Sequence, residues 1–311
     1  WRMLESYRKI LVTGGAGFVG SYIAEAVLEE DNEPVILDDL STGLQENVPD
    51  GLNFVQADVS DYDAVRKAMD GVDLVFHAAA QPLSGASMDR PLLDCRSNAL
   101  GTLTVLVAAL DAGVQRVVYT SSSAAYGEPV ALPMNEEQLP RPSAPYGVSK
   151  LAGEHYALTF ARSYGLPCVC LRPFNVYGER ENPETTQDEV FRYTRSILRG
   201  ERIPVSGDGT QTRDFVHARD VAIAHLLAAD SEDAVGQVFN VGTGGETSIN
   251  GLIEMLETVT GRRAVTTHQM WSSGDIYREY ADTRKAALTL EFKAEIALQD
   301  GIRELDRSSE A

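Results

Sequence analysis

The sequence predicts an α/β fold with a doubly wound parallel sheet and a smaller C-terminal α/β lobe. Over the first half of the chain, short β-branched runs alternate with longer amphipathic stretches. These runs are almost continuously apolar, as expected for parallel strands that helices cover on both faces. After Pro173 the alternation gives way to shorter, interrupted segments. The length of 311 residues suits one large domain with an added lobe.

The apolar runs and the stretches between them give the order of the elements. We expect strands at residues 10–13, 34–37, 53–56, 74–76 and 116–119. The intervening stretches predict helices over 19–29, 61–69 and 92–112. The second half predicts a helix over 146–164, a strand over 168–172, a polar loop over 179–188, a helix over 189–198, a Gly-rich turn at 207–209, a helix over 218–229, a strand over 237–241 and helices over 248–258 and 296–305.

The composition excludes several classes of protein. A net charge of −19 argues against nucleic acid as a partner, because phosphates need a basic surface, but a few local arginines still allow a diphosphate ligand. No apolar run approaches the ~20 residues of a membrane helix, and the N-terminus lacks a signal-peptide pattern. Of the three cysteines, Cys168 and Cys170 have neither metal-ligand nor redox spacing. We therefore expect a cytoplasmic protein without a metal site, with buried thiols in a reducing compartment.

A glycine-rich turn follows the first predicted strand. Gly14, Gly17 and Gly20 allow a tight turn, a close approach to a pyrophosphate and packing of helix on strand. The predicted helix begins at Val19, directly after Phe18, and its first turn offers free N–H groups to phosphates. The glycine pattern alone is weak, but the strand before it and the helix after it agree with a dinucleotide-binding site.

Acidic residues follow the second and third predicted strands. Asp38, with Asp39 beside it, stands where a carboxylate accepts hydrogen bonds from an adenosine ribose and repels a 2′-phosphate, which favours NAD over NADP. The alternative is that the two residues only cap a turn. Asp58 is placed to meet the adenine edge, or serves only as a turn residue.

Tyr146 and Lys150 open the long helix and share one of its faces, since residues four apart are neighbours. A phenol titrates near pH ~10, and a close cation lowers that value toward the range of a general base. Ser122 lies 24 residues before the tyrosine, at a Ser-rich strand end. Such a Tyr–Lys pair is commonly a solvated helix face, but its place after a dinucleotide motif favours catalysis.

Five segments together resemble the extended short-chain dehydrogenase/reductase superfamily and its NAD-dependent epimerase/dehydratase family. They are residues 13–20 (TGGAGFVG), 120–127 (TSSSAAYG), 146–150 (YGVSK), 171–178 (LRPFNVYG) and 211–217 (QTRDFVH). Within this family the sequence is most similar to the UDP-glucose 4-epimerases. The resemblance covers nearly the whole chain.

The resemblance implies an NAD-binding Rossmann domain over 1–173, to which 216–241 returns, and a nucleotide-sugar-binding lobe over 174–215 and 242–311. Tyr146 would be the base, Lys150 would hold the nicotinamide ribose, and Ser122 would bind the reacting sugar hydroxyl. Further cofactor contacts are implied for Val59, Ala78, Ala79, Ala80, Asn98 and Phe174. Substrate contacts are implied for Asn175, Arg213, Asp275 and Glu279.

The implied reaction is C4 epimerisation through a 4-keto sugar. Related dehydratases carry acidic residues directly after the catalytic Ser or Thr, whereas Ser123, Ala124 and Ala125 stand here. This difference favours epimerisation over elimination. The alternatives are another nucleotide-sugar epimerase or a 4-ketoreductase acting on a dTDP-, CDP-, UDP-uronic or UDP-N-acetyl sugar. A non-catalytic dinucleotide sensor is the alternative from another class.

The C-terminal lobe departs from the epimerase pattern. Where the family has Arg-x-Gly-Asp, residues 272–275 read Ser-Ser-Gly-Asp, so an arginine expected at the diphosphate is missing. Arg180, Arg192, Arg195 and Arg278 are candidates to replace it. Glu279 matches a position that limits which sugars fit; pointing inward it would disfavour an anionic sugar, and pointing outward it would have no effect.

A homodimer is also expected from the helices. The predicted helices over 92–112 and 144–164 are rich in Ala and Leu and suit a four-helix bundle with a second copy. Their apolar faces would equally cover the sheet of a single chain.

Overall fold

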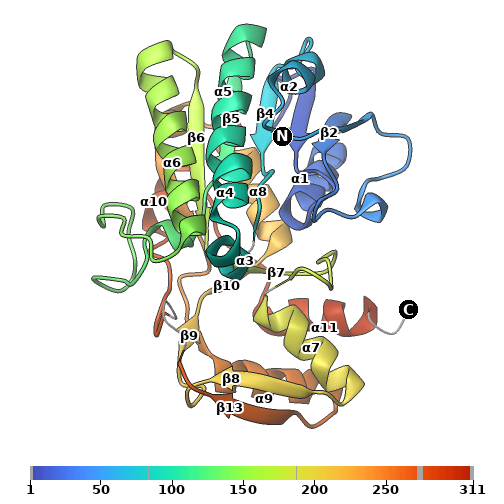
Figure 1. Ribbon diagram of the computed structural model, residues 1–311, viewed down its shortest axis with the longest axis vertical. Helices are drawn as coiled ribbons and strands as arrows, with labels where there is room; N and C mark the ends of the chain where they lie inside the picture. The colour runs from blue at the N-terminus through green and yellow to red at the C-terminus, as the bar shows by residue number, and fades with distance from the viewer. Residues whose placement is uncertain (1–2, 83, 187, 272–275, 309–311) are drawn as a thin grey trace.

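The computed structural model describes residues 3–82, 84–186, 188–271 and 276–308. The described residues form a seven-stranded sheet in the order β11-β6-β5-β4-β1-β2-β3, and every neighbouring pair is parallel (Figure 1). The strands are β1 (Ile10–Thr13), β2 (Pro34–Asp38), β3 (Phe54–Gln56), β4 (Leu74–His77), β5 (Arg116–Thr120), β6 (Cys168–Pro173) and β11 (Val238–Val241). This sheet, with helices on both faces, confirms the predicted fold class.

The period-2 geometry of the strands divides the core between the two faces of the sheet. In β1, Ile10 and Val12 belong to a cluster with helices α1 (Phe18–Glu29) and α8 (Ala218–Asp230). Leu11 points the other way, into a cluster that includes residues of three other helices. These helices are α2 (Tyr62–Ala68), α5 (Gly101–Ala112) and α6 (Pro145–Thr159). Because both faces are covered, the strands read as continuous apolar runs.

Two of the long predicted helices contain turns of π-helix. The region expected as one helix over 92–112 consists of α4 (Pro91–Asp94), η2 (Cys95–Leu100) and α5, and α3 (Ser84–Asp89) precedes them. The helix expected over 146–164 is α6 followed by η4 (Phe160–Tyr164). Both η2 and η4 are π-helical. An apolar periodicity predicts that a helix exists but does not reveal such wider turns.

A second group of elements lies below the sheet in Figure 1. Helices α7 (Glu189–Arg199), α9 (Ile249–Thr260) and α11 (Leu298–Ser308) share a separate hydrophobic cluster. Strands β8 (Arg202–Ser206) and β13 (Val265–Gln269) pair beside them. The sequence did not predict β13, because its side chains are mostly exposed and carry no alternation of apolar residues.

Short strand pairs join this group to the sheet. They are β7 (Asn175–Tyr177) with β10 (Phe215–His217), and β9 (Thr212–Arg213) with β12 (Thr247–Ser248). One later segment packs with the sheet instead. Helix α10 (Arg284–Thr289) contacts β11, and Ala286, Leu290 and Phe292 join the cluster around β1, although the expected boundaries assign them to the lobe.

A buried ion pair fixes α6 to β6. Both Nη2 and Nε of Arg172 donate to the carboxylate of Glu154, at 2.5 Å and 2.8 Å, and both side chains are almost wholly buried. Glu154 lies two turns after the start of the helix, on the face that meets the sheet. Removal of one partner of such a pair costs several kcal/mol, typically about 3–5, since the other charge stays buried.

Among the described residues, the structure has no helix long and apolar enough to span a bilayer.

Candidate active site

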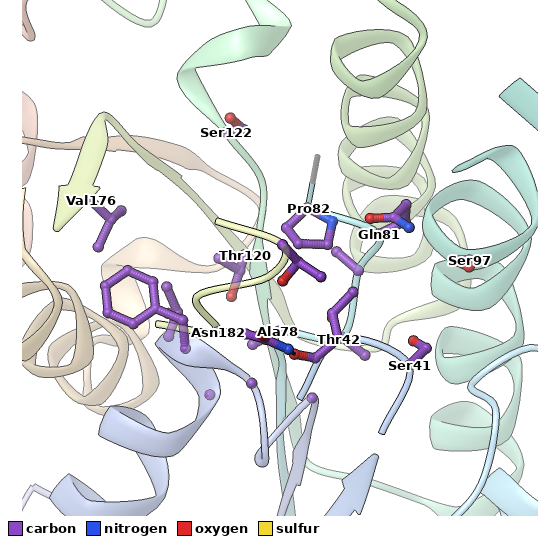
Figure 2. Close-up of a pocket in the computed structure, with 18 of the residues that line it drawn as sticks. Ser41, Thr42, Ala78, Gln81, Pro82, Ser97, Thr120, Ser122, Val176 and Asn182 are labelled. Atoms are coloured by element: carbon purple, nitrogen blue, oxygen red, sulfur yellow. Dashed lines mark hydrogen bonds between the residues drawn. The ribbon is translucent and has the colours of Figure 1, made fainter. Parts of the chain in front are cut away.

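The carboxyl ends of the parallel strands open on one pocket of about 480 Å³ (Figure 2). The pocket is lined by residues from the turn after β1 to the start of α7, and it lies at the sheet edge where ligands bind in open α/β sheets. Of the residues predicted to form the site, those lining it are Gly14, Gly17, Phe18, Val19, Asp38, Asp39, Asp58, Val59, Ala78, Ala79, Ala80, Ser122, Tyr146, Lys150, Phe174 and Asn175.

The glycine-rich turn is packed too closely for side chains. Gly14 has φ +71°, and a Cβ on it would lie 2.6 Å from the backbone N of Ala79. A Cβ on Gly20 would lie 2.0 Å from the carbonyl oxygen of Gly14. The N-cap residue of α1, Gly17, has no side chain to occupy the first N–H groups of the helix. This end of the pocket is therefore a cradle suited to a phosphate group.

Asp38, the last residue of β2, and Asp58, which follows β3, have different surroundings. Asp38 accepts hydrogen bonds from the backbone N–H groups of Ala16, at 3.1 Å, and Leu40, at 2.8 Å. Burial raises its pKa, and these two bonds oppose that rise. Asp58 forms an ion pair with Arg96, 3.0 Å from Nη2 to Oδ2, so part of its carboxylate is already bound by the protein. Arg96 lines the pocket as well, and no motif in the sequence indicated it.

Ser122, Tyr146 and Lys150 meet at one end of the pocket. Ser122 follows β5, and its side chain hydrogen-bonds to that of Tyr146. The Nζ of Lys150 donates to the carbonyl oxygen of Thr120 at 2.6 Å. Strand β5 and the residues that follow it thus contact both Lys150 and Tyr146, which binds the start of α6 to the sheet edge.

Burial moves the proton equilibria of this pair toward neutral side chains. It raises the pKa of Tyr146 to about 12, although the Ser122 hydrogen bond works against this. It lowers the pKa of Lys150 to about 7, and the Asp94 carboxylate works against that change. A phenol in this position needs added positive charge before it can act as a base near neutral pH.

Asn98 lies behind the pocket wall and does not line it. Its Oδ1 accepts from the backbone N of Gln81 at 2.7 Å, and its Nδ2 donates to the carbonyl oxygen of the same residue at 3.2 Å. Gln81 lines the pocket. Asn98 therefore holds a residue of the pocket wall, Gln81, in place and does not line the pocket itself.

Arg213 and Glu279, expected at the substrate, do not line the pocket but lie behind Asn175. The Nδ2 of Asn175 donates to Oε1 of Glu279, which is 5% exposed. Glu279 is thus buried against Asn175. Burial raises its pKa, and the nearby Arg213 guanidinium opposes the rise. Arg213 also donates to the carbonyl oxygens of Thr212 and Ile276, at 2.9 Å and 2.8 Å. Asp275 lies outside the described residues.

The four candidate replacement arginines have different surroundings. Within the described part of the chain, Arg180 is the one of the four that lines the pocket. It pairs with Glu25 at 2.7 Å, and its guanidinium lies 4.3 Å from the centre of the Tyr22 ring. Arg278 pairs with Glu246 instead, Arg195 lies over Phe191, and Arg192 is exposed.

Hydrogen bonds that the sequence did not indicate join two loops that line the pocket. The segment after β7 contacts the loop after β2 through Asn182, whose Nδ2 donates to the carbonyl oxygen of Thr42 at 3.0 Å (Figure 2). The Nδ2 of Asn47 donates to the carbonyl oxygens of Arg180 and Ala16, both at 3.1 Å. These asparagines stand in loops without any motif, so only the folded chain reveals their roles.

The NAD dependent epimerase/dehydratase family matches residues 10–242. The chain belongs to this family. A putative UDP-glucose 4-epimerase of Methanocaldococcus jannaschii is 38% identical over 296 residues, which cover 94% of this chain and 96% of that protein. The family resemblance predicted from the sequence is thereby confirmed.

Solved structures of family members agree along almost the whole chain. The UDP-glucose 4-epimerase of Thermotoga maritima, solved with UDP-glucose, has a TM-score of 0.92 at 34% identity, covering 97% of this chain and 98% of that one. The Thermus thermophilus UDP-glucose 4-epimerase, solved with NAD, has a TM-score of 0.90 at 35% identity, covering 96% and 98%.

NAD is the cofactor of the family, and the pocket fits it. The glycine cradle at α1 suits the pyrophosphate, and the buried Asp38 suits an adenosine ribose. Among the described residues, no group of three or more His, Cys, Asp or Glu side chains is arranged to hold a metal ion.

We predict that Gly14→Ala lowers NAD affinity at least about tenfold, because the added methyl would meet Ala79 inside the cradle. Isothermal calorimetry with NAD checks this. Gly71→Ala is the matched control: Gly71 also has a positive φ, +68°, but nothing lies within 4 Å of its Cβ position. An unchanged affinity in Gly14→Ala would contradict the placement of the cofactor.

Proposed function

We propose that this protein interconverts the C4 epimers of a UDP-hexose, of the UDP-glucose and UDP-galactose type. One observation carries the proposal: Ser122, Tyr146 and Lys150 meet at the pocket end beside Phe174 and Asn175. The residues that follow Ser122 are small and carry no carboxylate for elimination: Ser123, Ala124 and Ala125. The epimerase relatives, similar over almost the full length, support the same reaction.

The residues would share the proton chemistry at C4. Tyr146 would take the proton of the sugar hydroxyl, and Ser122 would orient that hydroxyl by a hydrogen bond. Lys150 would keep a positive charge beside the phenol and so favour phenolate. When bound, NAD supplies a hydride acceptor that also returns the hydride. Because epimerisation inverts the configuration at C4, the 4-keto sugar must rotate in the site so that the hydride returns to its opposite face.

The sugar must therefore be held less tightly than the nucleotide diphosphate. We assign diphosphate contacts to Asn175 and, in place of the missing arginine, to Arg180, since both line the pocket. Asp275 is assigned to the nucleotide ribose. Arg213 and Glu279 would act through Asn175, and the negative charge of Glu279, buried behind Asn175, would disfavour a uronic acid by like-charge repulsion.

We divide the chain accordingly into an NAD-binding domain, residues 1–173 with 216–241, and a nucleotide-sugar lobe. The lobe takes in 174–215 and 242–311, with the exception of 284–292, which pack on the sheet. A cytoplasmic location is also proposed. All three cysteines are free thiols, and burial raises the pKa of Cys168 to about 12, which suits a structural thiol in a reducing compartment.

A homodimer is proposed through the face formed by α3, α4, η2 and α6. Helix α5 buries Val105 and Leu106 against the sheet. In contrast, α3, α4, η2 and α6 leave apolar side chains exposed. The exposed side chains are Met88, Leu92, Leu100, Val148 and Tyr156. A cluster of this kind on adjacent helices suits a partner surface.

We predict that UDP-galactose incubated with the protein and NAD, without added reductant, gives the proton NMR anomeric signal of UDP-glucose. Parallel incubations with UDP-N-acetylgalactosamine, dTDP-glucose and UDP-glucuronate rank the substrates, and we expect UDP-glucuronate to react least.

Tyr146→Phe removes the base and should lower turnover about 10²–10⁴-fold while NAD still binds. An active Tyr146→Phe enzyme would contradict the mechanism, and stoichiometric NADH release would indicate a ketoreductase.

Sedimentation of the protein is expected to give twice its 33.8 kDa chain mass. Leu92→Glu, at a side chain 86% exposed, should shift the protein to monomer because it places a charge in the proposed interface. Leu288→Glu on α10 is the matched control, since Leu288 is 85% exposed but lies on another element. A wild-type monomer would reject the dimer.

A further inference from the structure

A buried carboxylate, Asp94, lies behind the Tyr–Lys pair and outside the pocket. It is the last residue of α4 and is 1% exposed. The mechanism proposed above does not use it. A carboxylate removed from water in this way is costly unless charge and hydrogen bonds compensate for it, so its surroundings indicate its role.

Hydrogen bonds connect Asp94 to the first turns of α6. The Nδ2 of Asn98 donates to Oδ1 of Asp94 at 2.9 Å and to Oγ of Ser149 at 3.0 Å. Ser149 lies between Tyr146 and Lys150, and its hydroxyl donates to the carbonyl oxygen of Tyr146 at 3.0 Å. The carboxylate thereby braces the helical turn that carries both side chains.

Helix α4 packs against α3, η2 and α6. Among the described ionisable groups of these three elements, Tyr146 and Lys150 both interact electrostatically with Asp94. The others are exposed or engaged elsewhere: Asp89, Cys95, His155 and Tyr156 are exposed, Arg96 pairs with Asp58, and Glu154 pairs with Arg172.

We propose that Asp94 is a positioning residue for the reaction: its carboxylate fixes Asn98 and Ser149 and supplies the negative charge that keeps the buried Lys150 ammonium protonated. The inference rests on the proposed function. Burial alone lowers the pKa of Lys150, and Asp94 opposes that effect. The same negative charge raises the pKa of Tyr146. Asp94 therefore makes the phenol less acidic while it stabilises the cation beside it.

Removing the negative charge of Asp94 should shift the titrations of Tyr146 and Lys150 in the same direction. A nearby carboxylate raises the pKa of both a phenol and an ammonium, so its removal lowers both. In Asp94→Asn, which keeps the shape and the acceptor oxygen, both limbs of the pH profile of kcat/KM with UDP-galactose should move to lower pH, by about 1 unit. Activity at the alkaline side should fall, because Lys150 loses its proton earlier.

A second readout does not depend on turnover. The ionisation of Tyr146 is followed in the NAD-bound protein by phenolate absorbance, as the difference from Tyr146→Phe. In Asp94→Asn this titration should also move to lower pH. An inactive wild-type enzyme would refute the proposed epimerisation without touching this result, so failure of the two proposals can be distinguished.

Two matched variants separate charge from shape. Asp89→Asn makes the same change at an exposed position on α3 and should leave both the rate and the limbs unchanged. Ser149→Ala removes the hydroxyl but keeps the charge, so the rate should fall while the limbs stay at their wild-type pH. Melting temperature and NAD affinity, measured on each variant, show whether the fold is retained.

The proposal would be overturned if a folded Asp94→Asn protein kept both limbs of the kcat/KM profile and the Tyr146 titration at their wild-type pH. This holds however much the rate falls. Limbs that move in Ser149→Ala would overturn it too, because the hydroxyl and not the charge would then be responsible. If Asp94→Asn does not fold, Asp94→Ser with the same two readouts decides the question.

Discussion

The burial of one ammonium group, that of Lys150, is the constraint on which the arrangement of the site depends. The side chain is enclosed between α6 and the sheet, and its Nζ donates to the last carbonyl oxygen of β5. A cation removed from water in this way requires acceptors and negative charge close by. The Thr120 carbonyl group and the Asp94 carboxylate meet that requirement, so β5, α6 and α4 are held together around the lysine.

The rest of the catalytic helix continues the same packing. A Cβ on Gly153 would lie 2.5 Å from the hydroxyl of Tyr119, so only glycine lets α6 approach β5 this closely. One residue later, Glu154 is joined to Arg172 of β6. Tyr146, Lys150 and Glu154 follow one another at intervals of four residues. A single helix face thus presents the proposed base, its cation and a structural anchor to the sheet.

The parts of the site that depend on residues close together in the sequence were predictable. The glycine turn, Asp38 and the Tyr–Lys pair depend on spacing within one strand–helix unit, and the structure places all of them on the pocket. Parallel strands bring their carboxyl ends to one edge, which explains why Ser122 could be predicted with them.

Contacts between segments far apart in the chain were not predictable. Asn47 and Asn182 become neighbours of the pocket only because two loops meet across it. Arg213 and Glu279 lie behind Asn175 instead of on the pocket surface. Arg213 belongs to β9, which pairs with β12, and Glu279 is held by hydrogen bonds to Asn175 and to the carbonyl oxygen of Thr212. The ion pair of Arg96 with Asp58 depends in the same way on how η2 is placed against the β3 end.

The most direct test of the central claim is the ionisation of Tyr146 in the presence and absence of its cation. Phenolate absorbance of the NAD-bound protein, corrected with Tyr146→Phe, measures its pKa in the wild type and in Lys150→Met. The account predicts a value below the ordinary ~10 of a phenol in the wild type and a clearly higher value in Lys150→Met. A Tyr146 that titrates near 12 in both proteins would contradict it.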